Sequence, residues 1–400
     1  MERMKVLFIF PWSKIGEQVL HPGISGTLRP ALASRRGGVE AIVLSDHVEG
    51  LGYLSQVNEL KIYRLPRLAP YPLGEFFRRS VWLHRYVRKV VEREGVDVIM
   101  CFFGTHHLTY LGTRKLMELG KPVILLFDYC FYYRREVPEN FSLYSRLPVG
   151  VFYKDRLEKI FMLSLLKKAT YVQVPSWTMT EYLKRDMPEE KLRYIPYPID
   201  TAFFSPSKDS GRLREELGLE GETLVTYHYG HDELLHHFLI HLGRKIEGDF
   251  KYFFSGPFRR EPLLRLLRRL GLEEKAVVPG PLPAERVPEA IATSDICLSF
   301  EVGATIFTKT LEYAACGRPI VSLYSPGVAE VVRHRREALI SSSPEFEGNE
   351  ELVGYVEELL ENRKLREKLG KRARERISRG YSYEVVSKKY KKLFENCFRG

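Results

Sequence analysis

The chain has 400 residues, of which 44% are hydrophobic and 28% charged. A chain of this length usually exceeds one hydrophobic core, so two domains are expected, and the apolar content excludes a disordered chain. The formal net charge is +11. Such a charge predicts attraction to nucleic acid, anionic lipid or phosphorylated substrates, although a solvated basic surface has the same composition.

Short apolar, β-prone runs alternate with helical patterns through the first half. None approaches the roughly 18 residues of a membrane-spanning helix, and the run at 6–10 is too short for a signal peptide. Runs apolar on both faces and separated by helices predict a parallel, doubly wound sheet. The predicted strands are Val6–Phe10, Glu40–Ser45, Lys61–Leu65, Val96–Phe103, Pro122–Asp128 and Tyr171–Pro175, with helices at Gly74–Glu94 and Leu108–Leu119.

The same alternation restarts after a stretch rich in Pro, Ser and Gly at 196–211, which has the composition of a linker. The second set of strands is Leu224–Tyr229, Lys251–Ser255, Ala276–Val278, Asp295–Phe300, Pro319–Tyr324 and Ala338–Ser342. We therefore predict two α/β domains, residues 1–203 completed by 381–400, and residues 204–380, facing a cleft. Ligands in such sheets bind outside the carboxyl ends of the strands.

The segment after the predicted strand at 295–300 carries the most information. Gly303 lets backbone approach a ligand closely, and the helix expected at Thr308–Cys316 would offer free N–H groups to a diphosphate. Lys309 lies in the first turn, where its positive charge is unfavourable beside the positive end of the helix dipole. A phosphate nearby would compensate for this repulsion. Glu312 shares its face and could accept ribose hydroxyls. An exposed helix start with an ordinary Lys–Glu pair is the alternative.

This segment resembles the donor-site motif of glycosyltransferase family 4, K-x-x-E-Y-x-A-x-G-K-P-V, at residues 309–320. Further similarities are the strand and turn at 168–176, the linker at 194–204, the strand at 293–298, and Tyr381-Ser382-Tyr383-Glu384 before the final helix. The resemblance implies a GT-B fold of two Rossmann-like domains with a C-terminal helix that crosses back to the first. It also implies retaining transfer from a UDP-, GDP- or ADP-linked sugar, with neither metal nor other cofactor.

The resemblance implies which residues surround the donor, and the sequence departs from the family at several of them. The first acid of the family's E-x7-E pair falls at Ala304, so Glu301 is the nearest acidic candidate. The G-R that holds the donor diphosphate is replaced by Gly230-His231. Three arrangements stay open. Lys309 with Arg259 and Arg260 could bind the phosphates, His231 with His236 could do so, or donor use has been lost or altered. The remaining donor-site candidates are Gly303, Thr305 and Gly23 of the first glycine-rich loop.

The first domain supplies the other catalytic candidates. His106 follows the strand that ends near Phe103, where a sugar or acceptor contact is expected, although a helix-capping role fits equally well. Asp128 is the candidate for acceptor contact, and Phe127 takes the place of the histidine that often precedes it in the family. Glu301, Asp128 and His106 are thus the nominated catalytic residues. His237 and His241 have the spacing of a metal pair, but no glutamate completes an H-E-x-x-H motif, so no metal is predicted.

A basic, aromatic helix at Phe76–Val90 could lie on an anionic membrane, as in family members with lipid-linked acceptors, or simply pack on the domain surface. No HTH, zinc or RRM signature indicates nucleic-acid binding. Four cysteines in apolar runs indicate reduced, buried thiols and a cytoplasmic location. The resemblance to family members with lipid-linked acceptors implies a peripheral contact with the inner membrane face. The predicted function is glycosyl transfer to a glycan, lipid-linked or small-molecule acceptor. The alternative is a GT-B protein that binds nucleotide or glycan without transfer, as a partner subunit.

Overall fold

The computed structural model describes residues 3–10, 28–48, 51–57, 60–65, 72–103, 109–128, 150–209, 211–228, 232–300, 303–304, 306 and 308–398. The chain divides into two compact units, Met1–Pro198 with Tyr383–Gly400, and Ile199–Ser382. Residues 199–203 and 381–382 thus fall in the second unit, whereas the sequence pattern assigned them to the first. The reason is local pairing, because the N–H of Ile199 donates to the carbonyl of Tyr381 at 2.8 Å and Ile199 bridges to Ser382.

The first unit contains an eight-stranded sheet of order β3-β4-β2-β1-β5-β6-β7-β8. All neighbours are parallel except β3 and β4. The strands are β1 (Lys5–Phe10), β2 (Glu40–Ser45), β3 (Leu54–Val57), β4 (Leu60–Arg64), β5 (Val98–Phe103), β6 (Val123–Phe127), β7 (Tyr171–Val174) and β8 (Leu192–Tyr194). The six predicted strands are present. The two that were not predicted, β3 and β8, are the edge strands, where burial on fewer sides shortens the apolar run.

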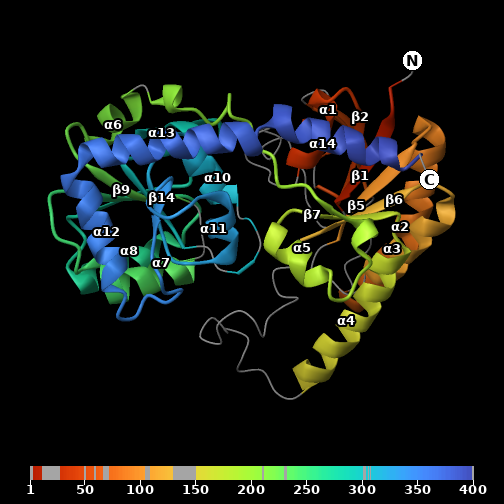
Figure 1. The fold of residues 1–400 in the computed structure, drawn as a ribbon, viewed down its shortest axis with the longest axis horizontal. Helices are drawn as coiled ribbons and strands as arrows, with labels where there is room; N and C mark the ends of the chain where they lie inside the picture. The colour runs from red at the N-terminus through yellow and green to blue at the C-terminus, as the bar shows by residue number, and fades with distance from the viewer. Residues whose placement is uncertain are drawn as a thin grey trace. The chain divides into compact units, whose positions relative to one another are not determined.

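The helices of this unit are α1 (Arg29–Arg36), α2 (Pro72–Glu94), α3 (Thr109–Leu116), α4 (Gly150–Lys168), α5 (Trp177–Leu183) and α14 (Tyr383–Asn396). The chain's last helix, α14, returns to this unit and lies beside α1, as Figure 1 shows. The Tyr390 hydroxyl of α14 donates a hydrogen bond to Oε1 of Gln173 at 3.3 Å, and Phe394 packs edge-on against Phe8 of β1. The C-terminal helix therefore completes the core of the first unit.

The second unit contains a parallel six-stranded sheet of order β11-β10-β9-β12-β13-β14. Each of its strands was predicted. They are β9 (Leu224–His228), β10 (Lys251–Ser255), β11 (Ala276–Gly280), β12 (Ile296–Ser299), β13 (Ile320–Ser322) and β14 (Ala338–Ile340). The buried residues of these strands are mostly apolar, with polar ones such as His228, Ser255 and Ser299 at strand ends, and Cys297 of β12 is a buried free thiol, as predicted.

Helices cover both faces of this sheet, with α13 and α10 on one side and α7 and α8 on the other (Figure 1). The set is α6 (Arg212–Leu217), α7 (Asp232–Phe238), α8 (Arg260–Leu270), α9 (Val287–Thr293), α10 (Thr308–Ala315), α11 (Pro326–Val331), α12 (Glu350–Glu361) and α13 (Arg363–Gly380). This arrangement is the doubly wound fold that the sequence predicts.

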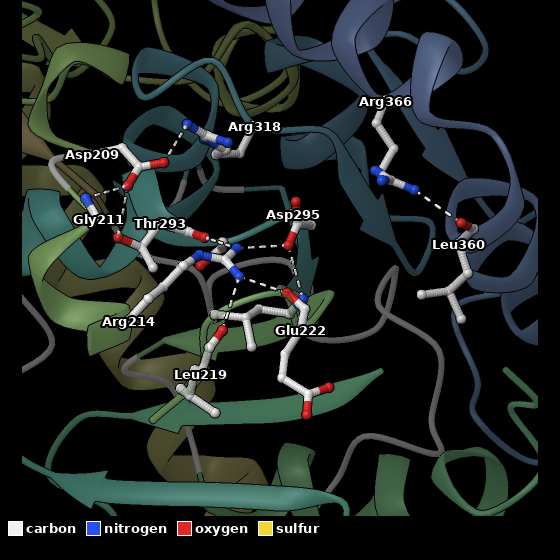
Figure 2. Close-up of polar contacts among 12 residues, drawn as sticks. Asp209, Gly211, Arg214, Leu219, Glu222, Thr293, Asp295, Arg318, Leu360 and Arg366 are labelled. Atoms are coloured by element: carbon white, nitrogen blue, oxygen red, sulfur yellow. Dashed lines mark hydrogen bonds and ion pairs between the residues drawn. The ribbon is translucent and has the colours of Figure 1, made fainter. Parts of the chain in front are cut away.

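Three arginines of α13 hold the ends of three other helices. Arg374 donates to the carbonyl of Ala315 at the end of α10, and Arg376 donates to Val331 at the end of α11 at 2.6 Å. Arg366 donates to Leu360 near the end of α12 at 2.9 Å, as Figure 2 shows. The last carbonyls of a helix lack intrahelical donors and carry the negative end of its dipole, so these cations stabilise all three termini.

Candidate functional site

The strand order of the second sheet reverses between β9 and β12. From β9 the chain winds outward to β10 and β11, and from β12 it winds the other way to β13 and β14. Ligand sites of open α/β sheets lie at such a reversal, outside the carboxyl ends of the strands. At this edge β9 ends at His228, its neighbour β10 ends at Ser255, and β12 ends at Ser299. The candidate site is built around these three residues.

Lys309 and Glu312 lie one turn apart on α10, the helix that follows β12. The Nζ atom of Lys309 is 3.2 Å from Oε2 of Glu312. The Glu312 side chain is only 4% exposed and that of Lys309 20% exposed. The helix is anchored to the sheet because the hydroxyls of Thr310 and Ser299 are 3.0 Å apart. The alternative interpretation is an exposed helix start with an ordinary surface Lys–Glu pair. The structure differs from it, because the carboxylate of Glu312 is mostly buried beside the Lys309 cation.

His228 closes this edge of the sheet. Its Nδ1 atom lies 2.6 Å from the hydroxyl of Ser255, and its backbone N–H donates to the hydroxyl of Tyr313 at 2.9 Å. That same hydroxyl donates to the His228 carbonyl at 3.1 Å. Burial, with the nearby Lys309 ammonium adding to it, holds the pKa of His228 well below its usual range. The imidazole is therefore neutral at pH 7.

His228 and Ser255 were not nominated from the sequence. Each ends an apolar strand, and that position is the only local signal for them. The predictions stressed His231 instead, which follows the same strand. His231 lies outside the described residues.

Two other predicted residues lie between β12 and α10. Gly303 has a φ of +96°, a conformation that glycine adopts without strain, and an added Cβ would meet no atom within 4 Å. Its carbonyl accepts from the N–H of Gly327 at 3.1 Å. Ala304 is half-buried. The predicted Glu301 and Thr305 belong to the same connection but lie outside the described residues.

Arg259 reaches the same edge from β10. It precedes α8 by one residue, four residues after the end of β10, and its side chain is exposed. The structure thus places Lys309, Glu312, Gly303, Ala304 and Arg259 on connections at the carboxyl edge of one sheet. Two cations and one acidic side chain here can bind an anion and accept hydroxyl groups.

The first unit has a corresponding reversal between β1 and β5. The predicted Gly23 and His106 follow these two strands in the sequence, but both lie outside the described residues. Asp128 directly follows β6, is half-buried, and accepts a hydrogen bond from the hydroxyl of Tyr197 at 2.6 Å. Phe127, at the position where the family often has histidine, is fully buried in the core.

The amphipathic pattern at 76–90 belongs to α2, whose side chains are described from Leu83 onward. Its apolar residues Leu83, Val87 and Val90 are 3% exposed or less, and α2 packs against α3. In this part of α2 the apolar face is therefore covered by protein, as the packed-helix alternative expects. Among the described residues no helix is both long and apolar enough to cross a membrane.

In the described part of the chain, the two histidines with the spacing of a metal pair do not form a metal site. The rings of His237 and His241 stack with centroids 5.8 Å apart. No third histidine, cysteine or acidic residue joins them, because the described residues contain no group of three such side chains.

One family-like motif has a structural role at the opposite, amino edge of the sheet. Asp295, just before β12, accepts from Arg214 of α6 at 2.8 Å and from the N–H of Leu224 at 2.9 Å. Arg214 also donates to carbonyls of Glu222 and Thr293, as Figure 2 shows. This network ties α6, β9 and β12 together, and only the tertiary structure identifies Arg214 as its centre.

Two family models match the chain, one in each half. The model described as Glycosyltransferase Family 4 matches residues 27–203. The model described as Glycosyl transferase-like matches residues 244–391. Glycosyltransferase models thus match both halves of the chain, and the model for the first half is that of family 4.

Similar proteins with curated names are distant. A GDP-mannose-dependent α-(1-6)-phosphatidylinositol monomannoside mannosyltransferase of Mycolicibacterium smegmatis is 28% identical over 173 residues, 40% of this chain and 45% of that protein. The chain thus matches less than half the length of that relative. An N-acetyl-α-D-glucosaminyl L-malate synthase of Bacillus anthracis is 24% identical over 350 residues, 86% of this chain and 83% of that protein.

Solved structures with the same fold cover nearly the whole chain. Sucrose-phosphate synthase from Thermosynechococcus elongatus superposes with a TM-score of 0.78 at 14% identity, over 99% of this chain and 100% of that one. Anabaena HepE in complex with UDP and glucose superposes with a TM-score of 0.71 at 16% identity, over 98% and 100%. At this identity the likeness shows the GT-B fold.

Proposed function

We propose that this protein transfers a sugar from a nucleotide-sugar donor to an acceptor, with the donor bound at the carboxyl edge of the second sheet. The observation that carries the proposal is the Lys309–Glu312 pair at the strand reversal, with Glu312 almost completely buried. The same residues match the donor motif of the family. In addition, the HepE neighbour was solved with UDP and with UDP-glucose.

In this proposal Lys309 and Arg259 neutralise the donor diphosphate, and Glu312 accepts the ribose hydroxyls. Lys309 is the stronger candidate for the first role because its ammonium already lies at the reversal, 3.2 Å from Glu312. A diphosphate would give this cation a further anionic partner, and charge-assisted contacts of that kind are among the strongest hydrogen bonds in proteins. The neutral His228 imidazole can contribute an uncharged N–H but no net charge.

For the acceptor we propose a site in the first unit near Asp128, and transfer with retention of configuration. The acceptor class stays open between a glycan, a lipid-linked molecule and a small molecule. The mannosyltransferase relative is named for a phosphatidylinositol acceptor and the synthase relative for L-malate, so these two acceptor types are the first to test. We further propose that transfer needs no metal and takes place in the cytoplasm, at the inner membrane face when the acceptor is lipid-linked.

The decisive experiment is a thermal-shift and calorimetry screen of the purified protein against UDP, GDP, ADP and their sugars. A ligand at about 100 times its Kd should stabilise the fold by roughly 2.7 kcal/mol. Glu312→Gln should abolish the selective shift. The matched control is Glu337→Gln, which alters another buried glutamate, 3% exposed and paired with Arg333 at 2.9 Å. It precedes β14, so it lies at the amino edge and should leave nucleotide binding unchanged.

Transfer itself is tested by incubating the matching nucleotide sugar with candidate acceptors and following product by NMR, which also reports the anomeric configuration. Activity that persists with EDTA supports the metal-free proposal. Tight nucleotide binding without hydrolysis or transfer would favour the partner-subunit alternative. No shift with any nucleotide, in a folded protein, would remove the donor-site proposal.

A further inference from the structure

The exposed face of α13 carries a stripe of cations that the fold does not use. The helix contains nine lysines and arginines against two glutamates. Arg366, Arg374 and Arg376 are used inside the unit, where they cap other helices. Arg363 pairs with Glu367 at 2.9 Å. The remaining exposed cations, which we call the α13 stripe, are Lys364, Lys368, Lys371, Arg372 and Arg379.

The α13 stripe lies on one side of the helix. Its successive members are spaced by four, three, one and seven residues, and at about 100° per residue they fall within one face of about 100°. The opposite face is buried, at Leu369, Gly370, Ala373 and Ile377. From Lys364 to Arg379 the stripe extends about 22 Å at 1.5 Å per residue. It is therefore a straight, solvent-facing row of positive charge, interrupted only by Glu375.

Arg379 lies in the last turn of α13, where a cation complements the helix dipole, but the cations nearer its start work against the helix. The first turn of α13 has no acidic residue, so its cations oppose the positive end of the dipole. Lys364 with Lys368, and Lys368 with Arg372, are like charges four residues apart, a spacing that destabilises a helix. Helix stability therefore does not explain this pattern of charges, and binding to an external partner explains it better.

The protein does not neutralise the stripe internally. Within the described part of the chain, the five side chains take part in no hydrogen bond or ion pair. Three glutamates of the neighbouring helix α12 have other partners: Glu350 pairs with Lys245, Glu358 with Arg335, and Glu357 accepts from the N–H of Glu247. The charge is thus available to an external anion.

We infer that the α13 stripe docks the second unit on an anionic lipid surface. Two features favour a bilayer over a nucleic acid. The stripe is exposed, and α13 contains no aromatic residue on which a base could stack. Juxtamembrane cations of this kind bind anionic lipid by charge alone, each strengthening binding by about fivefold at low salt. This inference does not depend on the proposed transfer activity, because it concerns a different face and needs no donor.

The test is sedimentation of the full-length protein with vesicles of phosphatidylcholine alone or with about 30% phosphatidylglycerol, an anionic lipid. We expect binding only to the anionic vesicles, lost as salt rises. The triple variant Lys364→Gln, Lys368→Gln and Arg372→Gln should bind at least tenfold more weakly. Gln preserves helix propensity, and circular dichroism checks that the variant is folded.

A matched control removes the same charge from another exposed basic helix of the same unit: Arg265→Gln, Arg268→Gln and Arg269→Gln in α8. This control variant should retain vesicle binding within about twofold. Charges that lie away from the lipid surface attract it only weakly, because salt screens their field. Equal weakening of both variants would show that net charge and not the stripe is responsible, and would overturn the inference. So would absence of binding to anionic vesicles, or binding to a single-stranded oligonucleotide with none to vesicles. Nucleotide thermal shifts are measured on the same variants. Failure of the lipid-binding inference would leave these shifts unchanged, whereas failure of the proposed function would remove them.

Discussion

The Nδ1 atom of His228 lies 2.6 Å from the hydroxyl of Ser255, so the last side chains of β9 and β10 are joined inside the second unit. His228 is 3% exposed. Its pKa is well below the usual value, chiefly because burial disfavours the charged ring. The candidate site therefore contains a histidine that the fold keeps neutral.

This lowered pKa predicts acid sensitivity of the fold. The unfolded chain takes up a proton on this imidazole near pH 6.5, whereas the folded chain does so only at lower pH. Stability from this group is thus complete above about pH 6.5 and falls below it, by up to about 1.4 kcal/mol per pH unit. His228→Asn should flatten that slope in urea unfolding measured at pH 7.5, 6.5 and 5.5. His237→Asn, an exposed histidine on α7, should keep the wild-type slope.

The Lys309–Glu312 pair predicts a separation of stability from binding. Lys309→Met removes the cation beside a buried carboxylate, so the free energy of unfolding should fall by about 1–3 kcal/mol. The double variant Lys309→Met with Glu312→Gln should recover at least half of that loss, because the buried charge is gone. Neither variant should bind a nucleoside diphosphate in calorimetry. A double variant that binds as tightly as the wild type would contradict the role of this pair.

A close approach of two glycines predicts a severe steric effect. A Cβ added at Gly370 of α13 would lie 2.0 Å from the carbonyl oxygen of Gly317, which follows α10. Both atoms belong to backbone, so Gly370→Ala should cost about 3 kcal/mol or more, measured by denaturant unfolding. Gly354→Ala in α12 is the control, since an added Cβ there meets nothing within 4 Å. It should stabilise the helix by about 0.5–1 kcal/mol.

The network at Asp295 predicts loss of stability without loss of donor affinity. Asp295→Asn weakens the bonds to Arg214 and to the N–H of Leu224, which join α6, β9 and β12. We expect a loss of about 1.5–3 kcal/mol in unfolding free energy. Nucleotide Kd should stay within about twofold, because the network lies at the amino edge of the sheet.

The comparison for Asp295 is Arg212→Gln, which removes a 75% exposed partner of Glu216. Surface ion pairs contribute little, so this change should stay within about 0.5 kcal/mol. A loss of donor affinity in Asp295→Asn comparable to that in Glu312→Gln would mean that the network reaches the binding site.

Much of the fold could be read from local pattern. All strands of the second sheet and six of the eight in the first follow from apolar runs separated by helical periods. The shared helical face of Lys309 and Glu312 follows from their spacing alone. The α13 charge pattern is likewise visible in the printed sequence. These features depend on neighbours within about a dozen residues, and local periodicity encodes them directly.

Other features depended on which distant elements meet. The sequence does not state that β9 and β12 are neighbours, although this places the candidate site. The His228–Ser255 contact spans 27 residues, and the Arg214–Asp295 contact spans 81. Two different family-like motifs contain Glu312 at the carboxyl edge and Asp295 at the amino edge, and only their places in the sheet separate a proposed binding role from a structural one. Local periodicity determines helices and strands, but partner choice is decided by the packing of whole elements, because burial energy is gained only when they come together.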